Sequence, residues 1–481
     1  MVFSSTIFLF FFLPIVLILY YLVPSKFKNI ILLFSSLVFY AWGEPIYIIL
    51  MCISSFVDYL NGRLLAKNNN EKTRKRFLTI AIFINLSLLG FFKYSDFLIR
   101  ICNSIFNTSI PLLNLGLPIG ISFYTFQTMS YSIDVYRRSV DVETNYFRYL
   151  TYVSLFPQLV AGPIVRYSTI ANELKDRKII FDNIVEGFLR FLRGLFKKIL
   201  IANNIGIMYE TILASDLNQL SVLTLWLGII CYAVQIYFDF SGYSDMAIGI
   251  GKMLGFNFNE NFDYPYISKS ISEFWRRWHI SLGTWFKDYV LYPFLKSDHI
   301  QKLQSALKDK CGKTVGKNIT IALGTLLVFF LTGLWHGANY NFIFWGLYYA
   351  FFLIIEDIFL KKALRSHKIL SHIYVCMVVL IGYVIFSIED LSILSSYFNG
   401  LFGLSSLPLI DQSFVFYLTN YGLMIFIGII FCMPIMQIIP NKIKDSMIFN
   451  ILKGIVYVIL FLVCICFIVS DSYNPFLYFR F

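Results

Sequence analysis

The sequence predicts an all-α polytopic membrane protein with roughly 10 to 12 transmembrane helices. Of its 481 residues, 58% are hydrophobic and 14% are charged, whereas a soluble domain carries about 25% charged residues. The chain also contains 51 Phe and 32 Tyr, which suits the aromatic belts found at both membrane surfaces. Apolar runs recur along the whole length, so most side chains must face lipid or other helices.

Eleven segments approach the length of about 20 apolar residues that crosses the hydrocarbon core. Because the N-terminus lacks a basic region and a nearby cleavage site of small residues, we expect the first segment to be a retained span. The predicted segments are 5–23, 29–41, 45–62, 77–99, 117–136, 219–250, 318–336, 339–360, 369–388, 413–436 and 451–470.

Lys and Arg predict the orientation, because they collect in cytoplasmic loops. Segment 63–76 holds six, 302–317 holds five and 361–368 holds four, whereas 101–116 and 389–411 hold none. Counting spans from these loops places the N-terminus and the C-terminal segment on the extracytoplasmic side of a bacterial cell membrane.

The formal charge of +12 does not indicate a nucleic-acid partner, since the basic residues sit in short clusters between apolar runs. We expect membrane lipids to surround the chain instead. The eight Cys fall mostly inside apolar stretches and follow neither a disulfide nor a zinc-site spacing. We interpret them as small packing residues.

We expect a single membrane domain over residues 1–481, in which the middle differs from the rest. Prolines, glycines and charges interrupt its apolar runs, and irregular backbone at membrane depth requires protein or a water-filled cavity to cover it. The absence of an internal repeat counts against an inverted-repeat transporter. The expected regions are N-terminal spans (1–136), a re-entrant and interfacial core (137–300), a hairpin with His336 (301–360), and C-terminal spans with an external tail (361–481).

His336 lies where two apolar runs meet with no charge nearby. An ionisable side chain in such a place marks a pathway, a relay or an active site. The alternative is a neutral histidine hydrogen-bonded between helices. His299, His367 and His372 have ordinary surface interpretations.

His279 lies in a segment rich in Trp and Arg. On a helix, Trp275, His279 and Trp278 would share one face. The alternative is an amphipathic interfacial helix without a catalytic purpose.

Two histidines in an apolar cavity could move the proton of an acyl transfer, in which a neutral imidazole deprotonates the attacking hydroxyl. Such a site also needs donors for the oxyanion. Candidate donors are Asn339, Asn341 and Ser241. No third ligand is spaced for a metal, so we expect no metal site.

Two carboxylates, Asp239 and Asp245, lie within one apolar segment. A proton relay is conceivable. We favour ion pairs with Arg276, Arg277 or Lys252, which would satisfy both charges without implying catalysis.

The chain resembles the membrane-bound O-acyltransferases, in the branch that includes the alginate O-acetylation protein and the teichoic-acid D-alanyl transfer protein. Five stretches carry the resemblance, in order: Pro118–Tyr136, Phe156–Tyr167, Tyr237–Phe256, Asn261–Phe294 and Gly333–Asn339.

The resemblance implies that His336 is the catalytic histidine and His279 the second histidine. It also implies helices around a central funnel that opens outside, and a tunnel to the cytoplasmic face. The acyl donor, acetyl-CoA or another acyl thioester, would arrive from the cytoplasm, with no cofactor held permanently. An SGNH-type extracytoplasmic partner would complete delivery to a polysaccharide. Candidates for lining the tunnel or supporting the site are Trp335, Asn339, Trp275, Trp278, Asp239 and Ser241.

The C-terminal segment Pro475–Phe481 resembles an F-x-Y-x-x-F ending of this branch, in which the tyrosine is proposed to accept the acyl group transiently. Tyr478 is therefore a candidate acyl relay, and the alternative is an interfacial aromatic anchor.

We expect an O-acyltransferase, specifically an O-acetyltransferase, that modifies an extracytoplasmic polysaccharide or cell-wall polymer. One alternative is an enzyme of the same fold that acylates a lipid or a protein. Another is a non-enzymatic transporter or secretion component.

Overall fold

The computed structural model describes residues 1–160 and 162–470, and the described part of the chain consists of helices and loops. Two compact units divide it: residues 1–194 with 243–260, and residues 195–242 with 261 onward. Eight of the described helices are long and apolar enough to cross a membrane. All eleven predicted segments are helical, so the prediction of an all-α polytopic membrane protein is confirmed.

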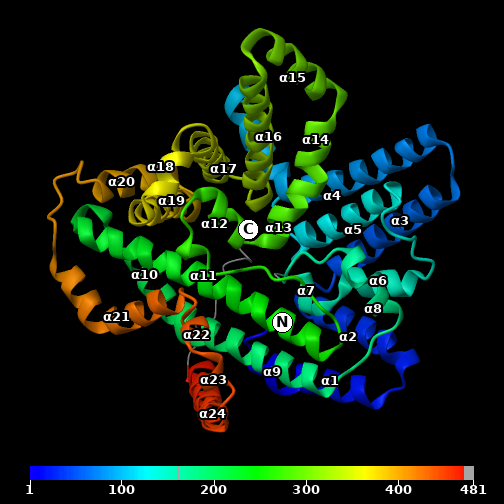
Figure 1. Ribbon diagram of the computed structural model, residues 1–481, viewed down its shortest axis with the longest axis horizontal. Helices are drawn as coiled ribbons and strands as arrows, with labels where there is room; N and C mark the ends of the chain where they lie inside the picture. The colour runs from blue at the N-terminus through cyan, green and yellow to red at the C-terminus, as the bar shows by residue number, and fades with distance from the viewer. Residues whose placement is uncertain (161, 471–481) are drawn as a thin grey trace. The chain divides into compact units, whose positions relative to one another are not determined.

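The first unit contains the N-terminal helices (Figure 1). A buried polar network joins three of them: Asn85 Nδ2 donates to both oxygens of Asp58, at 3.0 and 2.9 Å, and Ser132 Oγ donates to Asp58 Oδ1 at 3.1 Å. These bonds satisfy a carboxylate among apolar helices. The helices are α1 (Leu13–Leu22), α2 (Lys28–Gly43), α3 (Tyr47–Lys67), α4 (Glu71–Phe106), α5 (Ile121–Tyr136), α6 (Tyr146–Ser154), α7 (Phe156–Leu159), α8 (Tyr167–Lys175) and most of α9 (Phe181–Phe196).

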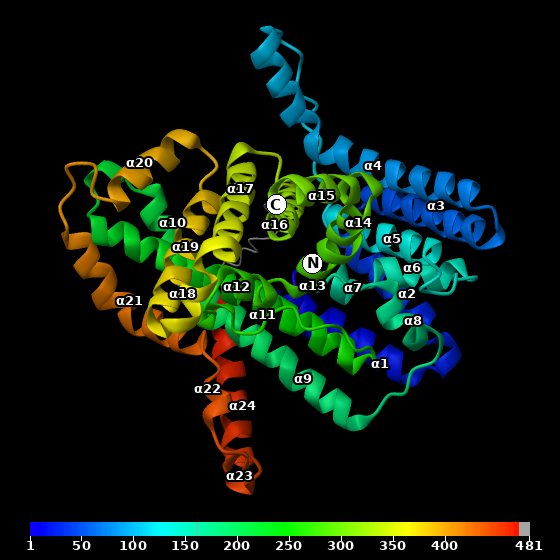
Figure 2. The same ribbon diagram turned by 45° about the horizontal axis from the view of Figure 1, so that its top comes forward.

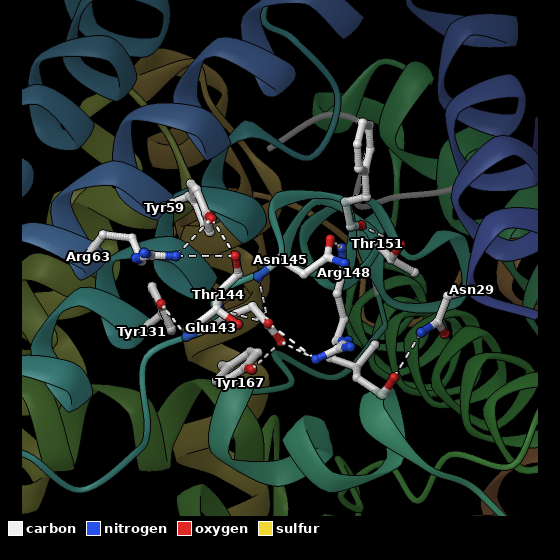
Figure 3. Close-up of polar contacts among 12 residues, drawn as sticks. Asn29, Tyr59, Arg63, Tyr131, Glu143, Thr144, Asn145, Arg148, Thr151 and Tyr167 are labelled. Carbon is white, nitrogen blue, oxygen red and sulfur yellow. Dashed lines mark hydrogen bonds and ion pairs between the residues drawn. The ribbon is translucent and has the colours of Figure 1, made fainter. Parts of the chain in front are cut away.

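Glu143 joins the loop after α5 to α6 and α8 (Figure 3). Its buried carboxylate accepts hydrogen bonds from Tyr167 Oη at 2.9 Å and from the backbone N–H groups of Thr144 and Asn145 at 2.8 and 2.9 Å. Arg148 pairs with it at 3.3 Å. The charge is fully compensated, which makes Glu143 a structural anchor.

The second unit begins with the last two residues of α9 and the π-helical segment Lys197–Asn203, and it contains both candidate histidines. Along the chain, the short helices α12 and α13 follow the long helix α11 and precede the α16–α17 hairpin. The helices are α10 (Asn204–Ala214), α11 (Val222–Met253, whose last part belongs to the first unit), α12 (Ile271–Arg277), α13 (Ile280–Phe286), α14 (Tyr292–Lys296), α15 (Asp298–Cys311), α16 (Lys313–His336), α17 (Tyr340–Ile355), α18 (Lys361–Ser366), α19 (Lys368–Ser387), α20 (Leu391–Leu401), α21 (Gln412–Phe431), α22 (Ile435–Ile438), α23 (Asn441–Lys444) and α24 (Met447–Ser470).

Helices α16 and α17 lie side by side in both ribbon views (Figures 1 and 2). Two glycines allow this approach: a Cβ on Gly333 would lie 2.3 Å from Phe342 O, and one on Gly346 would lie 2.3 Å from Phe329 O. Any side chain at either position would push the helices apart. The contact fixes the end of α16, where His336 lies.

The middle of the chain is broken into short pieces, as the sequence predicts. Helices α6, α7, α8, α12, α13 and α14 each have nine residues or fewer. Pro157 lies in the first turn of α7, where a missing N–H is tolerated. Gly120 precedes α5 in the left-handed conformation (φ 77°) and approaches the backbone of Leu159, where a Cβ would lie 2.6 Å from its carbonyl oxygen.

Candidate active site

His336 is the last residue of α16 and is buried. Its imidazole meets three aromatic rings edge to face: Trp335 and Trp345, each with a centroid distance of 5.0 Å, and Phe386 at 5.1 Å. The rings come from α16, α17 and α19, so three helices fix the orientation of this imidazole. An imidazole held in a fixed orientation can act as the general base of a proton transfer.

The loop after His336 is held by two asparagines that the sequence suggested as oxyanion donors. Asn339 caps α17, where its Oδ1 accepts from the Tyr340 N–H at 2.6 Å. Asn341 Nδ2 donates to the carbonyls of Ile385 and Phe386 at 3.3 and 3.1 Å. Both amides therefore shape the hairpin and its contact with α19.

His279 lies in a break between two helices, so the predicted helical face shared by Trp275, Trp278 and His279 is wrong. Helix α12 ends at Arg277, Trp278 is extended, and His279 takes the left-handed conformation (φ 45°) before α13 begins. A non-glycine residue in this conformation is strained by roughly 1–2 kcal/mol. Such strain persists only where surrounding contacts impose it, commonly at functional sites.

Those contacts come from residues 261–263, which run beside the break. The Ile280 N–H donates to Asn261 O, and the Asp263 N–H donates to Arg277 O, both at 3.0 Å. Arg277 also pairs with the carboxylate of Asp263 at 2.7 Å. The backbone bonds on both sides of His279 hold its strained conformation in place.

Asn261 also fixes the tautomer of His279, a role that no sequence motif indicated. Asn261 Oδ1 accepts from the Ser281 N–H at 3.2 Å and from Ser281 Oγ at 2.8 Å, which identifies the oxygen end of the amide. His279 Nδ1 lies 3.1 Å from the same oxygen and must therefore carry the hydrogen. The lone pair of the neutral imidazole is then on Nε2.

Burial lowers the pKa of His279 to about 3. The desolvated ring loses the hydration that would stabilise an imidazolium. His279 is therefore neutral at physiological pH, with Nε2 able to accept a hydrogen bond.

The two histidines belong to one aromatic cluster, as the sequence suggested. The Trp335 ring contacts both of them, with a centroid distance of 6.0 Å to His279 and 5.0 Å to His336. Phe240 of α11 covers His279 edge to face at 4.7 Å. Two imidazoles that share one aromatic cluster can take up and return the proton of an acyl transfer to a hydroxyl.

Trp275 and Trp278 point to different parts of this cluster. Trp275 meets Trp345 and Tyr349 of α17, at 5.5 and 4.9 Å between centroids. Trp278 stacks on Phe274 at 5.7 Å and meets Phe262 edge to face at 5.1 Å. Trp275 thus extends the surroundings of His336, whereas Trp278 packs beneath the break at His279.

Asp239 and Asp245 are paired, but the predicted partners are wrong. Asp239 pairs with Lys198 at 2.6 Å, and both side chains are at most 3% exposed. Asp245 pairs with Arg190 at 2.9 Å. Ser241 Oγ lies 3.5 Å from Lys197 Nζ. The π-helical segment Lys197–Asn203 changes the spacing of the turn that carries both lysines.

The remaining sequence candidates lie elsewhere. Tyr478 falls outside the described residues. His299 and His367 are exposed, and His372 Nδ1 lies 3.0 Å from Ser268 O. Within residues 1–160 and 162–470, no group of three or more His, Cys, Asp or Glu could hold a metal ion.

Comparisons with known proteins identify the family of this chain. The model of the MBOAT, membrane-bound O-acyltransferase family, matches residues 136–307, which include His279. A probable alginate O-acetylase of Azotobacter vinelandii is 38% identical over 417 residues, or 85% of this chain and 80% of that protein.

Two further relatives have related names. A peptidoglycan O-acetyltransferase of Helicobacter pylori is 30% identical over 86% of this chain and 82% of its own length. A teichoic acid D-alanyltransferase of Bacillus subtilis is 28% identical over 58% of this chain and 70% of its own length. The chain therefore belongs to the membrane-bound O-acyltransferase family and is a multi-pass membrane acyltransferase.

Proposed function

We propose that this enzyme moves an acetyl group from a cytoplasmic acyl thioester, such as acetyl-CoA, to an extracytoplasmic polysaccharide or cell-wall polymer. The names of two relatives, a probable alginate O-acetylase and a peptidoglycan O-acetyltransferase, support the acetyl group and the polymer. The observation that carries the chemistry is the joint packing of the two buried histidines, His279 and His336, on Trp335.

In this proposal His336 is the general base. Its imidazole takes the proton from an attacking hydroxyl, whose oxygen adds to the thioester carbonyl. The C–S bond then breaks, and the imidazolium returns the proton to the departing thiolate. His279 Nε2, which can only accept, takes a hydrogen bond from a second hydroxyl of the acceptor and orients the acceptor beside His336.

The attacking hydroxyl belongs to the acceptor or to Tyr478. If Tyr478 is the first acceptor, an SGNH-type partner takes the acetyl group from it on the extracytoplasmic side. The charge pattern supports this arrangement, since the basic segments 63–76, 302–317 and 361–368 then face the cytoplasm and both termini lie outside in the cell membrane. A funnel from outside and a tunnel from the cytoplasm would let acceptor and donor meet at His336.

Transfer from labelled acetyl-CoA by the purified full chain in lipid nanodiscs tests this function. His336→Ala should lose transfer by at least a hundredfold, as expected for removal of a general base. His367→Ala is the matched control, since His367 is exposed, and it should retain full activity. Unchanged transfer by His336→Ala would overturn the assignment.

The same assay separates the alternatives that the sequence left open. Membership in an acyltransferase family sets aside the non-enzymatic transporter. Label recovered on lipid or on a protein substrate, instead of on the chain or a polymer, would favour the lipid or protein acyltransferase. Tyr478→Phe should abolish label on the chain if Tyr478 is a relay, and should have no effect if it is an anchor.

A further inference from the structure

Three buried side chains with hydrogen-bond donors contact one another, and one of them contacts His336. They are Nε1 of Trp275 on α12, and Nε1 of Trp345 and Oη of Tyr349 on successive turns of α17. None of the three atoms has a hydrogen-bond partner within the described residues. We call these side chains the donor row.

The rings of the donor row are in mutual contact. Trp275 and Trp345 are 5.5 Å apart between centroids, Trp275 and Tyr349 4.9 Å, and Trp345 and Tyr349 5.2 Å. Trp345 meets His336 at 5.0 Å. The row therefore starts at the candidate catalytic base and continues along α17, away from the hairpin loop.

The surrounding structure holds these side chains firmly. Glu356, just after α17, accepts hydrogen bonds from the N–H groups of Ile271 and Ser272 at 2.6 and 3.1 Å, and so fixes the start of the helix that carries Trp275. Tyr349 packs against Gly382 of α19, where an added Cβ would lie 2.5 Å from Tyr349 Oη. The donors are thus placed by rigid neighbours, without the local acceptors that buried donors normally find.

The chemistry of the row indicates what it binds. An indole N–H can only donate, so two of the three groups require an acceptor atom. A sugar hydroxyl also donates a hydrogen, and within this row only Tyr349 Oη could accept it. Carbonyl oxygens only accept, and the aromatic faces between the donors suit the apolar parts of an acyl chain or a thioester arm.

The direction of the row favours the same ligand. From Tyr349, helix α17 continues toward α18, which carries Lys362, Arg365 and Lys361, the last of them paired with Asp357 at 2.9 Å. Positive charge at this end of the row attracts an acyl donor whose carrier group is negatively charged.

Resting on the proposed function, we infer that Trp275, Trp345 and Tyr349 bind the carbonyl oxygens of the acyl thioester and hold its acyl group beside His336. Trp345, which contacts the imidazole, binds the oxygen nearest the reacting carbon. The other two donors bind carbonyls further along the thioester arm.

The test uses the purified full chain in nanodiscs, with acetyl-CoA and its thioether analogue, which lacks the thioester carbonyl. Trp275→Phe, Trp345→Phe and Tyr349→Phe each remove one hydrogen-bonding hydrogen and keep a ring. Each should raise the KM for acetyl-CoA about tenfold. Trp345→Phe should also bind acetyl-CoA and the thioether equally, whereas the wild-type chain prefers the thioester.

Tyr348→Phe is the matched control, because Tyr348 Oη donates to Val378 O at 2.9 Å and is already satisfied. It should lower the melting temperature and leave the KM unchanged. Tyr349→Phe should raise the KM and should also raise the melting temperature, since a buried donor without a partner carries a desolvation penalty in the empty protein.

Unchanged KM values in all three variants, or a lowered melting temperature with an unchanged KM in Trp345→Phe, would overturn the inference, because the N–H groups would then act only on neighbouring ring faces. A wild-type chain that transfers nothing from acetyl-CoA would instead count against the proposed function. His336→Ala separates the two further, since it should still bind acetyl-CoA while losing transfer.

Discussion

Asn261 Oδ1 lies 3.1 Å from His279 Nδ1 and is held there by two donors of Ser281. This single contact determines which nitrogen of His279 can accept a proton. It also joins the loop before α12 to the residue that precedes α13. Asn261 is therefore a positioning residue for the second histidine.

Replacing Asn261 should impair transfer without removing either histidine. Asn261→Ala frees the imidazole to rotate and to change tautomer, and we expect the kcat to fall about tenfold to a hundredfold. The kcat of acetyl transfer measures this effect when it is compared with that of Asn218→Ala, an exposed residue of the 3₁₀ helix Leu217–Gln219. Equal values for the two variants would show that Asn261 has no positioning role.

His279 should stay neutral well below the pKa of a free histidine, about 6.5. Only five histidines occur, so ¹⁵N-histidine labelling with His279→Gln for assignment isolates its signals. We expect the Nδ1-protonated neutral tautomer down to pH 4.5, because burial lowers the pKa to about 3. An imidazolium signal that appears near pH 6.5 would contradict the buried, desolvated position.

The same shift makes stability depend on pH. Below pH 6.5 the unfolded chain binds a proton at His279 that the folded chain does not bind until about pH 3. The contribution of neutral His279 to the free energy of unfolding is therefore fully present above pH 6.5. As the pH falls below 6.5, this free energy decreases by up to about 1.4 kcal/mol per pH unit. Thermal unfolding from pH 7 to 5 should show a smaller loss of stability in His279→Gln than in the wild-type chain.

The buried ion pair of Lys198 and Asp239 should show strong coupling. Lys198→Met or Asp239→Leu alone leaves an uncompensated buried charge, and each should destabilise the protein by about 3–5 kcal/mol. The double variant should recover most of that loss, which thermal unfolding in detergent can measure. Additive losses in the double variant would show that the pair contributes through other contacts.

The glycine contact between α16 and α17 should be essential for activity. Gly333→Ala places a methyl group against Phe342 O and pushes the end of α16 away from α17, so transfer should fall together with the melting temperature. Gly454→Ala in α24 is the control, because no atom lies within 4 Å of its added Cβ. Full activity in Gly333→Ala would show that the hairpin can adjust without displacing His336.

Apolar periodicity and breaks predicted the helices well, because lipid and helix contacts both select apolar runs. His336 could be identified from its place between two such runs. The prediction of one helical face over Trp275–His279 was wrong. Asn261 and Asp263, more than ten residues away, impose a break in the helix that local propensity does not show. The predicted partners of Asp239 and Asp245 were wrong for a related reason. Their actual partners, Lys198 and Arg190, lie on segments that only the tertiary fold brings near the two carboxylates.

The left-handed backbone at His279 restricts which replacements are informative at that position. A valine or isoleucine at position 279 would disturb the backbone, since branched side chains tolerate this geometry poorly. A loss of activity could then not be attributed to the missing imidazole. Asparagine adopts it readily. His279→Asn is thus the substitution that changes proton affinity while sparing the chain path, so a mutational survey of this site should begin there.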